Sequence, residues 1–252
     1  MEKLNFNKII RRSFAILFWV MLWQIVSNVV GKELLIASPY SVVKSIIKLC
    51  GEGSFWNSLW FTFIRISLGF ILAMILGVSM AVVSGKSILI KEVLGVPMTI
   101  IKSVPVASFI IIALIWISSK NLSIFISFLM VLPIFYTNTL KGIECVDKQL
   151  LQMSQVFKIG VIKKIRYIYI PQIMPYFISS ATVSLGLCWK AGIAAEVIGI
   201  PTGSIGEQLY QSKIFLNTSE LFAWTVVIII ISVIFEKAFM LMLRKMEEKI
   251  YC

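Results

Sequence analysis

Long apolar runs alternate with short polar segments along most of the chain. A helix that crosses a bilayer needs roughly 20 mostly apolar residues, and six stretches come close to that length. Backbone groups in lipid must be hydrogen-bonded within the segment, which favours helices, and the two-residue alternation of a membrane β-barrel is absent. The pattern predicts an all-α polytopic membrane protein with about six transmembrane helices, at about residues 14–30, 59–83, 93–118, 122–138, 173–200 and 221–243.

The third of these stretches is interrupted by Pro97 and Pro105. Proline in a helix interior removes a hydrogen bond and clashes with the preceding turn. Lys102 lies between the two prolines, so we expect the chain to leave regular helix there and Lys102 to face a protein-lined cavity. Lys102 and Pro105 are therefore candidates for lining a translocation path.

The composition indicates a protein with little water-facing surface. Hydrophobic residues make up 59% of the chain and charged residues 14%, whereas soluble domains carry about 25% charged residues. A formal net charge of +12 could indicate nucleic-acid binding. The basic residues, however, lie in short segments between apolar runs, which is where they fix the orientation of membrane proteins.

The same distribution predicts the topology. With the N-terminus inside, sixteen basic residues fall on inner segments and five on outer segments, as the excess of basic residues in cytoplasmic loops requires. We expect residues 1–13 and 245–252 to be cytoplasmic and residues 14–244 to form the transmembrane domain. The basic start resembles a signal peptide, but no small-residue cleavage site follows Val30, so residues 14–30 are interpreted as an uncleaved span.

Several chemical functions are disfavoured by the residues that the chain lacks. It has no histidine, the usual general base and a common metal ligand. The segment 85–87 reads Gly-Lys-Ser like the end of a phosphate-binding loop, but Met80 stands where the first glycine belongs. No catalytic residue, metal or cofactor is therefore expected, and no ATP hydrolysis by the chain itself. The cysteines are scattered, which argues against a zinc site or a disulfide framework; they are Cys50, Cys145, Cys188 and Cys252.

Two segments are too polar to span the membrane yet carry a helical pattern. Residues 39–49 place apolar side chains on one face and are expected to lie along the outer membrane surface. Residues 141–172 form the longest inner segment, and its apolar side chains recur at near-helical spacing: Leu150, Leu151, Met153, Val156 and Phe157. Such a face docks another protein or rests on lipid headgroups, and the pattern alone does not separate these alternatives.

Charged residues within spans are costly and are functional candidates by default. Arg65 either belongs to a site or extends toward the outer surface from the end of its span. Lys190 and Glu196 are six residues apart, roughly 240° around a helix, so they are not expected to pair with each other. Each either lines the path or bridges helices. The Gly- and Pro-rich residues 199–206 mark an outer turn, read as a gate or a plain loop.

The inner segment resembles the EAA loop of ABC importer permeases, which reads E-A-A-x-x-x-G, then nine intervening residues, then I-x-L-P. The thirteen-residue step from Lys158 to Pro171 is kept. Gln152, Met153 and Ser154 replace the family's Glu and two Ala, and Lys158 replaces its Gly. Residues 37–39, 58–69, 102–108 and 194–199 are similar to segments of the nitrate/sulfonate/taurine-type permeases, so the resemblance runs from about residue 36 to about 245.

This resemblance implies a type I importer permease in a bacterial inner membrane, with two permease subunits, here expected to be a homodimer, around one path. It implies a cytoplasmic ABC ATPase that docks on the loop, and an extracellular solute-binding protein that delivers a small solute. Relatives that carry nitrate, sulfonates, taurine or bicarbonate indicate an anion. The implied coupling residues are Gln152, Met153, Ser154, Phe157, Lys158 and Pro171, and the path candidates are Lys102, Pro105, Lys190 and Glu196.

A transporter or channel that works alone is the alternative. It would need coupling-ion residues within the membrane, for which Glu196 is the only deep acidic candidate that the sequence pattern suggests. Secondary transporters are also commonly built from inverted repeats, and none is apparent in the sequence.

Overall fold

A computed structural model describes residues 2–251, and the side chains of residue 11 and of residues 14–248. This part of the chain is helical and contains no strand. The long helices are α1 (Glu2–Val30), α3 (Gly53–Ser84), α6 (Ser119–Glu144), α9 (Ile170–Gly199) and α11 (Thr218–Tyr251). The shorter ones are α2 (Pro39–Cys50), α4 (Ile88–Ser103), α5 (Val106–Ala113), α7 (Lys148–Val156), α8 (Val161–Lys164), the π-helix η1 (Ile165–Tyr169) and α10 (Ile205–Ile214). The all-α polytopic fold is confirmed.

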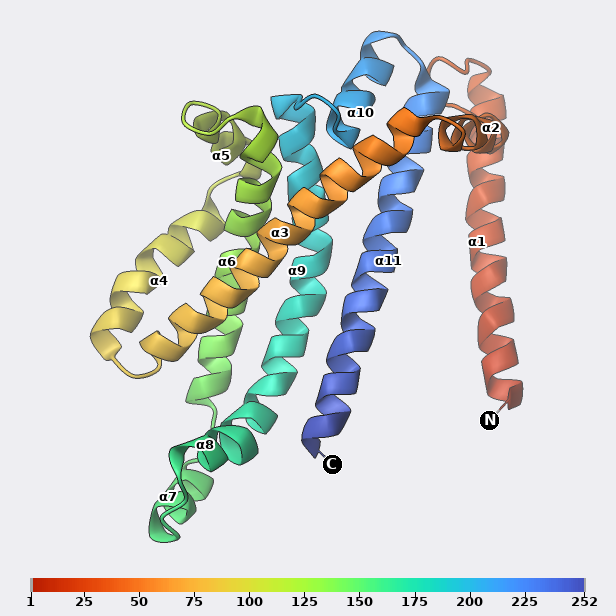
Figure 1. Cartoon of the computed structure of the whole chain (residues 1–252). Coiled ribbons are helices and arrows are strands. Elements are labelled where there is room, and N and C mark those ends of the chain that lie inside the picture. Colours follow the sequence, from red (N-terminus) through yellow and green to blue (C-terminus); the bar gives the residue numbers. More distant parts are fainter. Residues whose placement is uncertain (1, 252) are drawn as a thin grey trace.

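The number of spans is less definite than the fold. Four helical segments are long and apolar enough to cross a membrane, and the bent pair α4–α5 makes a fifth if it is one span. The apolar part of α1, Phe14–Val30, is shorter than these and stands apart from the bundle in Figure 1. Six spans require α1 to cross as well, so the count of six stays a prediction.

The interruption of the third span lies later and is shorter than expected. Pro97 remains inside α4, and α4 and α5 meet at a bend of 103°. Val104 has an extended backbone and Pro105 precedes the first residue of α5, as a residue before proline avoids the helical region. The expectation that the chain leaves the helix at Lys102 is therefore wrong, because Lys102 lies in the last turn of α4.

Helix α6 is the centre of the bundle, with α3 and α9 packed along it (Figure 1). Glycines let α3 approach closely, since a Cβ at Gly69 would lie 2.5 Å from the carbonyl oxygen of Ile124, and one at Gly77 would lie 2.9 Å from Cβ of Phe135. Small residues serve this purpose in membrane bundles. Phe70 and Phe135 fill the adjoining core, with ring centroids 5.8 Å apart.

The short helices occupy opposite ends of the bundle. Figure 1 shows α2 and α10 at one end, and α7, α8 and both chain termini toward the other. The face of α2 is divided differently from the expectation of one membrane-facing stripe: Val42 is buried in a cluster with Trp224, while Val43 and Ile47 are exposed. One side of helix α2 therefore packs on the protein, and another side is exposed.

Candidate coupling and translocation sites

Beyond the end of α6, the expected coupling segment forms a hairpin of α7 and α8, called the coupling hairpin from here on (Figure 1). Asp147 begins α7 by accepting a 2.7 Å hydrogen bond from the backbone N–H of Gln149, a typical N-cap contact. The backbone N–H of Asp147 donates to Oε1 of Gln172 at 2.8 Å. The base of the hairpin is thus tied to the start of α9, and the chain has little slack between α6 and α7.

A left-handed residue closes α7. Lys158 has φ +49°, its N–H donates to the carbonyl oxygen of Gln155 at 3.0 Å, and the N–H of Ile159 donates to that of Ser154 at 2.9 Å. This is the hydrogen-bond pattern of a Schellman cap, whose left-handed position usually holds glycine. The place where this chain departs from the EAA pattern therefore keeps the backbone conformation that glycine favours.

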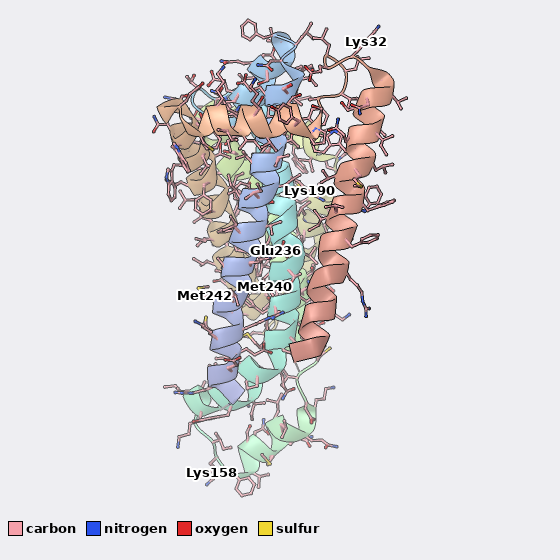
Figure 2. All side chains as sticks on the ribbon, turned by 90° about the vertical axis from the view of Figure 1, so that its right-hand side faces the viewer. Lys32, Lys158, Lys190, Glu236, Met240 and Met242 are labelled. Carbon is pink, nitrogen blue, oxygen red and sulfur yellow. The ribbon has the colours of Figure 1, made fainter. Side chains whose placement is uncertain are left out.

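The same hairpin presents an unpaired apolar surface. Val156 and Phe157 are 78% and 72% exposed, and Met153 is also exposed. Gln152 is exposed too, whereas Ser154 is buried and its hydroxyl donates to the carbonyl oxygen of Leu151 at 2.6 Å. Figure 2 places Lys158 at the tip of the molecule, at the opposite end from Lys32. These side chains form an exposed apolar patch that another protein can cover on binding.

Pro171 lies where the hairpin joins α9. The preceding residues Ile165–Tyr169 form a π-helix, and α8, η1 and α9 run on as one 39-residue helical segment. Proline cannot donate a backbone hydrogen bond and crowds the carbonyl four residues earlier, and a wider π turn accommodates such a residue. The family's proline position therefore coincides with a local widening of the helix.

Three of the path candidates are exposed in the single subunit. Lys102 Nζ donates to Oγ1 of Thr137 on α6 at 3.1 Å, close to the α4–α5 bend. Pro105 is exposed at that bend, and Lys190 is exposed on α9 (Figure 2). Lys102 and Pro105 are thus brought near each other, while Lys190 lies on a different helix.

Glu196 lies in a different environment, fully buried where α3, α9 and α10 meet. Thr62 Oγ1 donates to its Oε2 at 2.7 Å, and the backbone N–H of Gly206 donates to the same oxygen at 3.3 Å. The N–H of Ile205 donates in turn to Thr62 Oγ1 at 3.0 Å. The carboxylate thus sits at the N-terminus of α10, where a negative charge is favourable. This geometry favours the bridging alternative over a path-lining one.

Sequence reasoning did not identify Thr62 and Gly206 as partners of Glu196. A Cβ at Gly206 would lie 2.3 Å from Cβ of Glu196, so α10 rests directly on the last turn of α9. Gly206 stands in the Gly- and Pro-rich stretch that signalled a turn, and Thr62 is a hydroxyl inside an apolar run. Neither signal indicates a contact with Glu196, which is 134 residues from Thr62 and ten residues from Gly206.

Two further charged side chains, Arg65 and Glu236, lie within the long apolar helices. Arg65 Nε donates to the carbonyl oxygen of Lys120, and its guanidinium carbon lies 3.6 Å from the ring centroid of Phe61. Arg65 therefore extends from α3 to the start of α6. Glu236, a half-buried carboxylate inside α11, was not singled out from the sequence (Figure 2).

The described cysteines are unpaired: Cys50 and Cys145 are exposed and Cys188 is buried. Cys252 and the side chains of Lys3, Lys8, Arg12 and Lys249 lie outside the described residues. Among the described side chains, those of residue 11 and of residues 14–248, no group of three potential metal ligands comes together.

Comparison with known proteins gives a consistent result. A model of the family described as "Binding-protein-dependent transport system inner membrane component" matches residues 69–250. The chain is 23% identical to the putative aliphatic sulfonates transport permease protein SsuC of Bacillus subtilis, over 90% of this chain and 83% of the relative. It is 26% identical to the nitrate import permease protein NrtB of Leptolyngbya laminosa, over 79% and 75%.

A solved structure supports the fold. The chain superposes on one described as the crystal structure of an amino acid ABC transporter with histidines, with a TM-score of 0.51, 18% identity, and coverage of 76% of this chain and 90% of that chain. At this identity the similarity concerns the fold alone.

Proposed function

The chain belongs to the family of binding-protein-dependent transport system inner membrane components, and from this premise we propose that it is the permease subunit of an ABC importer for a small anionic solute. The relatives it resembles are permeases for sulfonates, nitrate, bicarbonate and taurine. Each of these solutes carries an anionic group. The chain itself supplies the membrane path, and ATP hydrolysis belongs to a partner.

The coupling hairpin is the observation that carries the proposal. It extends beyond the bundle, is tied to both α6 and α9, and exposes Val156 and Phe157. An aromatic side chain in an exposed apolar patch is typical of the anchors that dominate protein–protein binding. The partner proposed for this face is a cytoplasmic ABC ATPase.

The topology proposed with it has the hairpin and both termini in the cytoplasm. The basic residues of the inner segments support this orientation, and both termini lie toward the hairpin's end of the molecule (Figure 1). At the opposite end, α2 and α10 are available to an extracellular solute-binding protein. A second copy of the chain is proposed to complete the path, with Lys102 and Lys190 facing it.

Reconstitution tests the function directly. The permease is placed in proteoliposomes with its cognate ABC ATPase and solute-binding protein, and uptake of nitrate, bicarbonate, taurine and an aliphatic sulfonate is measured. We expect uptake of at least one of these anions only when ATP and both partners are present. Transport by the permease alone would instead support a stand-alone transporter or channel.

A further inference from the structure

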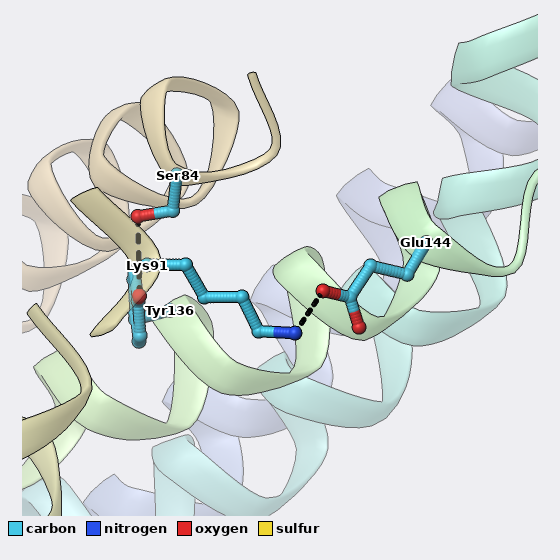
Figure 3. A network of polar contacts seen from close by, with 4 residues as sticks. All are labelled: Ser84, Lys91, Tyr136 and Glu144. Atoms are coloured by element: carbon cyan, nitrogen blue, oxygen red, sulfur yellow. Dashed lines mark hydrogen bonds and ion pairs between the residues drawn. The ribbon is translucent and has the colours of Figure 1, made fainter. Parts of the chain in front are cut away.

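Helices α3, α4 and α6 come together near Ser84, and buried contacts fix α3 there (Figure 3). Tyr136 Oη on α6 donates to Oγ of Ser84 at 3.1 Å, and both side chains are buried. Next to them, a Cβ at Gly85 would lie 2.9 Å from a methyl carbon of Ile143. Close-packed contacts of this kind hold α3 and α6 in one arrangement.

Helix α4 is connected to α6 mainly by polar side-chain contacts. Lys91 Nζ lies 2.6 Å from Oε1 of Glu144, and these side chains are 47% and 46% exposed (Figure 3). Farther along α4, Lys102 donates to Thr137, also on α6. Met98 is the single buried side chain among the residues of α4. Polar tethers at two points therefore connect α4 to α6, with little buried packing between them.

Glu144 stands at the junction of the bundle and the hairpin. It is the last residue of α6, and Asp147, the cap of α7, follows three residues later. Val146 between them is buried, and Asp147 is held by Gln172. A displacement of α7 therefore reaches Glu144 through a short, anchored connection.

We propose that Lys91 and Glu144 are positioning residues for transport, which make α4 follow the movement of the coupling hairpin. The inference rests on the proposed function, because it assumes that a partner moves the hairpin. Half-exposed ion pairs are weak, so this one can break and re-form as the subunit changes state. Helix α4 leads directly into the α4–α5 bend, where Lys102 and Pro105 lie. The ion pair thus links the ATPase face to the candidate path.

Charge exchange in the reconstituted transporter tests this inference. Lys91→Glu and Glu144→Lys are measured singly and together, with the amount of the transported anion taken up per ATP hydrolysed as the readout. We expect each single reversal to lower this ratio roughly two- to fivefold, the range that a half-exposed ion pair supports. The double exchange should restore the ratio, because the pair re-forms with opposite polarity.

Lys245→Glu is the matched control, since it makes the same charge change at an exposed position on α11, away from α4, and Lys245 has no ion pair among the described side chains. It should leave the ratio unchanged. Normal ratios in both single variants, or a double exchange no better than either, would overturn the inference. Where a reversal fails to assemble, Lys91→Gln and Glu144→Gln are measured singly instead, and normal ratios in both would overturn the inference. Wild-type transporter without ATP-dependent uptake would instead remove the proposed function, and this inference with it.

Discussion

Thr62 and Glu196 lie 134 residues apart in sequence, and the hydroxyl of one donates a 2.7 Å hydrogen bond to the fully buried carboxylate of the other. The same hydroxyl accepts from the N–H of Ile205. One side chain of α3 therefore connects the end of α9 to the start of α10. The ends of these three helices at the α10 end of the bundle are held as one unit.

Removing the Thr62 hydroxyl should destabilise the permease. Thr62→Val leaves the Glu196 carboxylate and the Ile205 N–H without this partner, and a buried polar group left unpaired costs about 1–3 kcal/mol. Thr62→Ser keeps the hydroxyl and is the control. Thermal unfolding of the purified protein in detergent should show a lower Tm for Thr62→Val than for Thr62→Ser, and equal Tm values would contradict the bridging role.

Gly206 should tolerate no side chain. In Gly206→Ala the new Cβ would meet Glu196 Cβ at 2.3 Å, and overpacking of this kind costs about 1–3 kcal/mol. Gly186→Ala is the matched control, because nothing lies within 4 Å of its Cβ and alanine is the better helix former. A lower Tm for Gly206→Ala beside an unchanged or higher Tm for Gly186→Ala is expected, and the reverse order would refute the close packing of α10 on α9.

Native cysteines can report the topology. Cys50 is exposed on α2 and Cys145 is exposed at the end of α6. In variants that retain one of them, a membrane-impermeant maleimide should label Cys50 in intact cells and Cys145 only after permeabilisation. Labelling of Cys145 in intact cells would place the coupling hairpin outside and contradict the orientation.

The candidate path can be tested through charge. Lys102→Gln should raise the KM for uptake of the transported anion several-fold, because it removes a positive charge at the α4–α5 bend, while Lys102→Arg should retain most of the affinity. Lys245→Gln, which removes a positive charge at an exposed position near the end of α11, serves as the control. A KM unaffected by Lys102→Gln would exclude Lys102 from the path.

The sequence alone predicted the helices whose apolar residues form a long run or recur at helical spacing. Apolar runs predicted α3, α6, α9 and α11 to within a few residues at most ends, because lipid requires long apolar helices. The helical spacing of apolar side chains also predicted α2 and α7. Helical periodicity relates residues only three or four positions apart, so it can be recognised in a short stretch of sequence.

Local sequence patterns could not predict contacts between segments that are distant in the sequence. The pairing of Glu196 with Thr62 and of Lys91 with Glu144 depends on how helices pack, and no local spacing encodes it. The division of α2 between buried Val42 and exposed Val43 depends likewise on Trp224 of α11. At Lys102 the error was local, since Pro97 was tolerated within α4 and the break came at Pro105.

Recovery of the ATPase with the permease is the most direct test of the coupling hairpin. Phe157→Glu alters a side chain that is 72% exposed on the hairpin, and Phe215→Glu makes the same change at a 77% exposed position at the opposite end. If Phe157 is an anchor of the interface, its variant should reduce co-purified ATPase at least about tenfold and abolish uptake, while Phe215→Glu binds ATPase like the wild type. Unchanged ATPase recovery and uptake with Phe157→Glu would contradict the account.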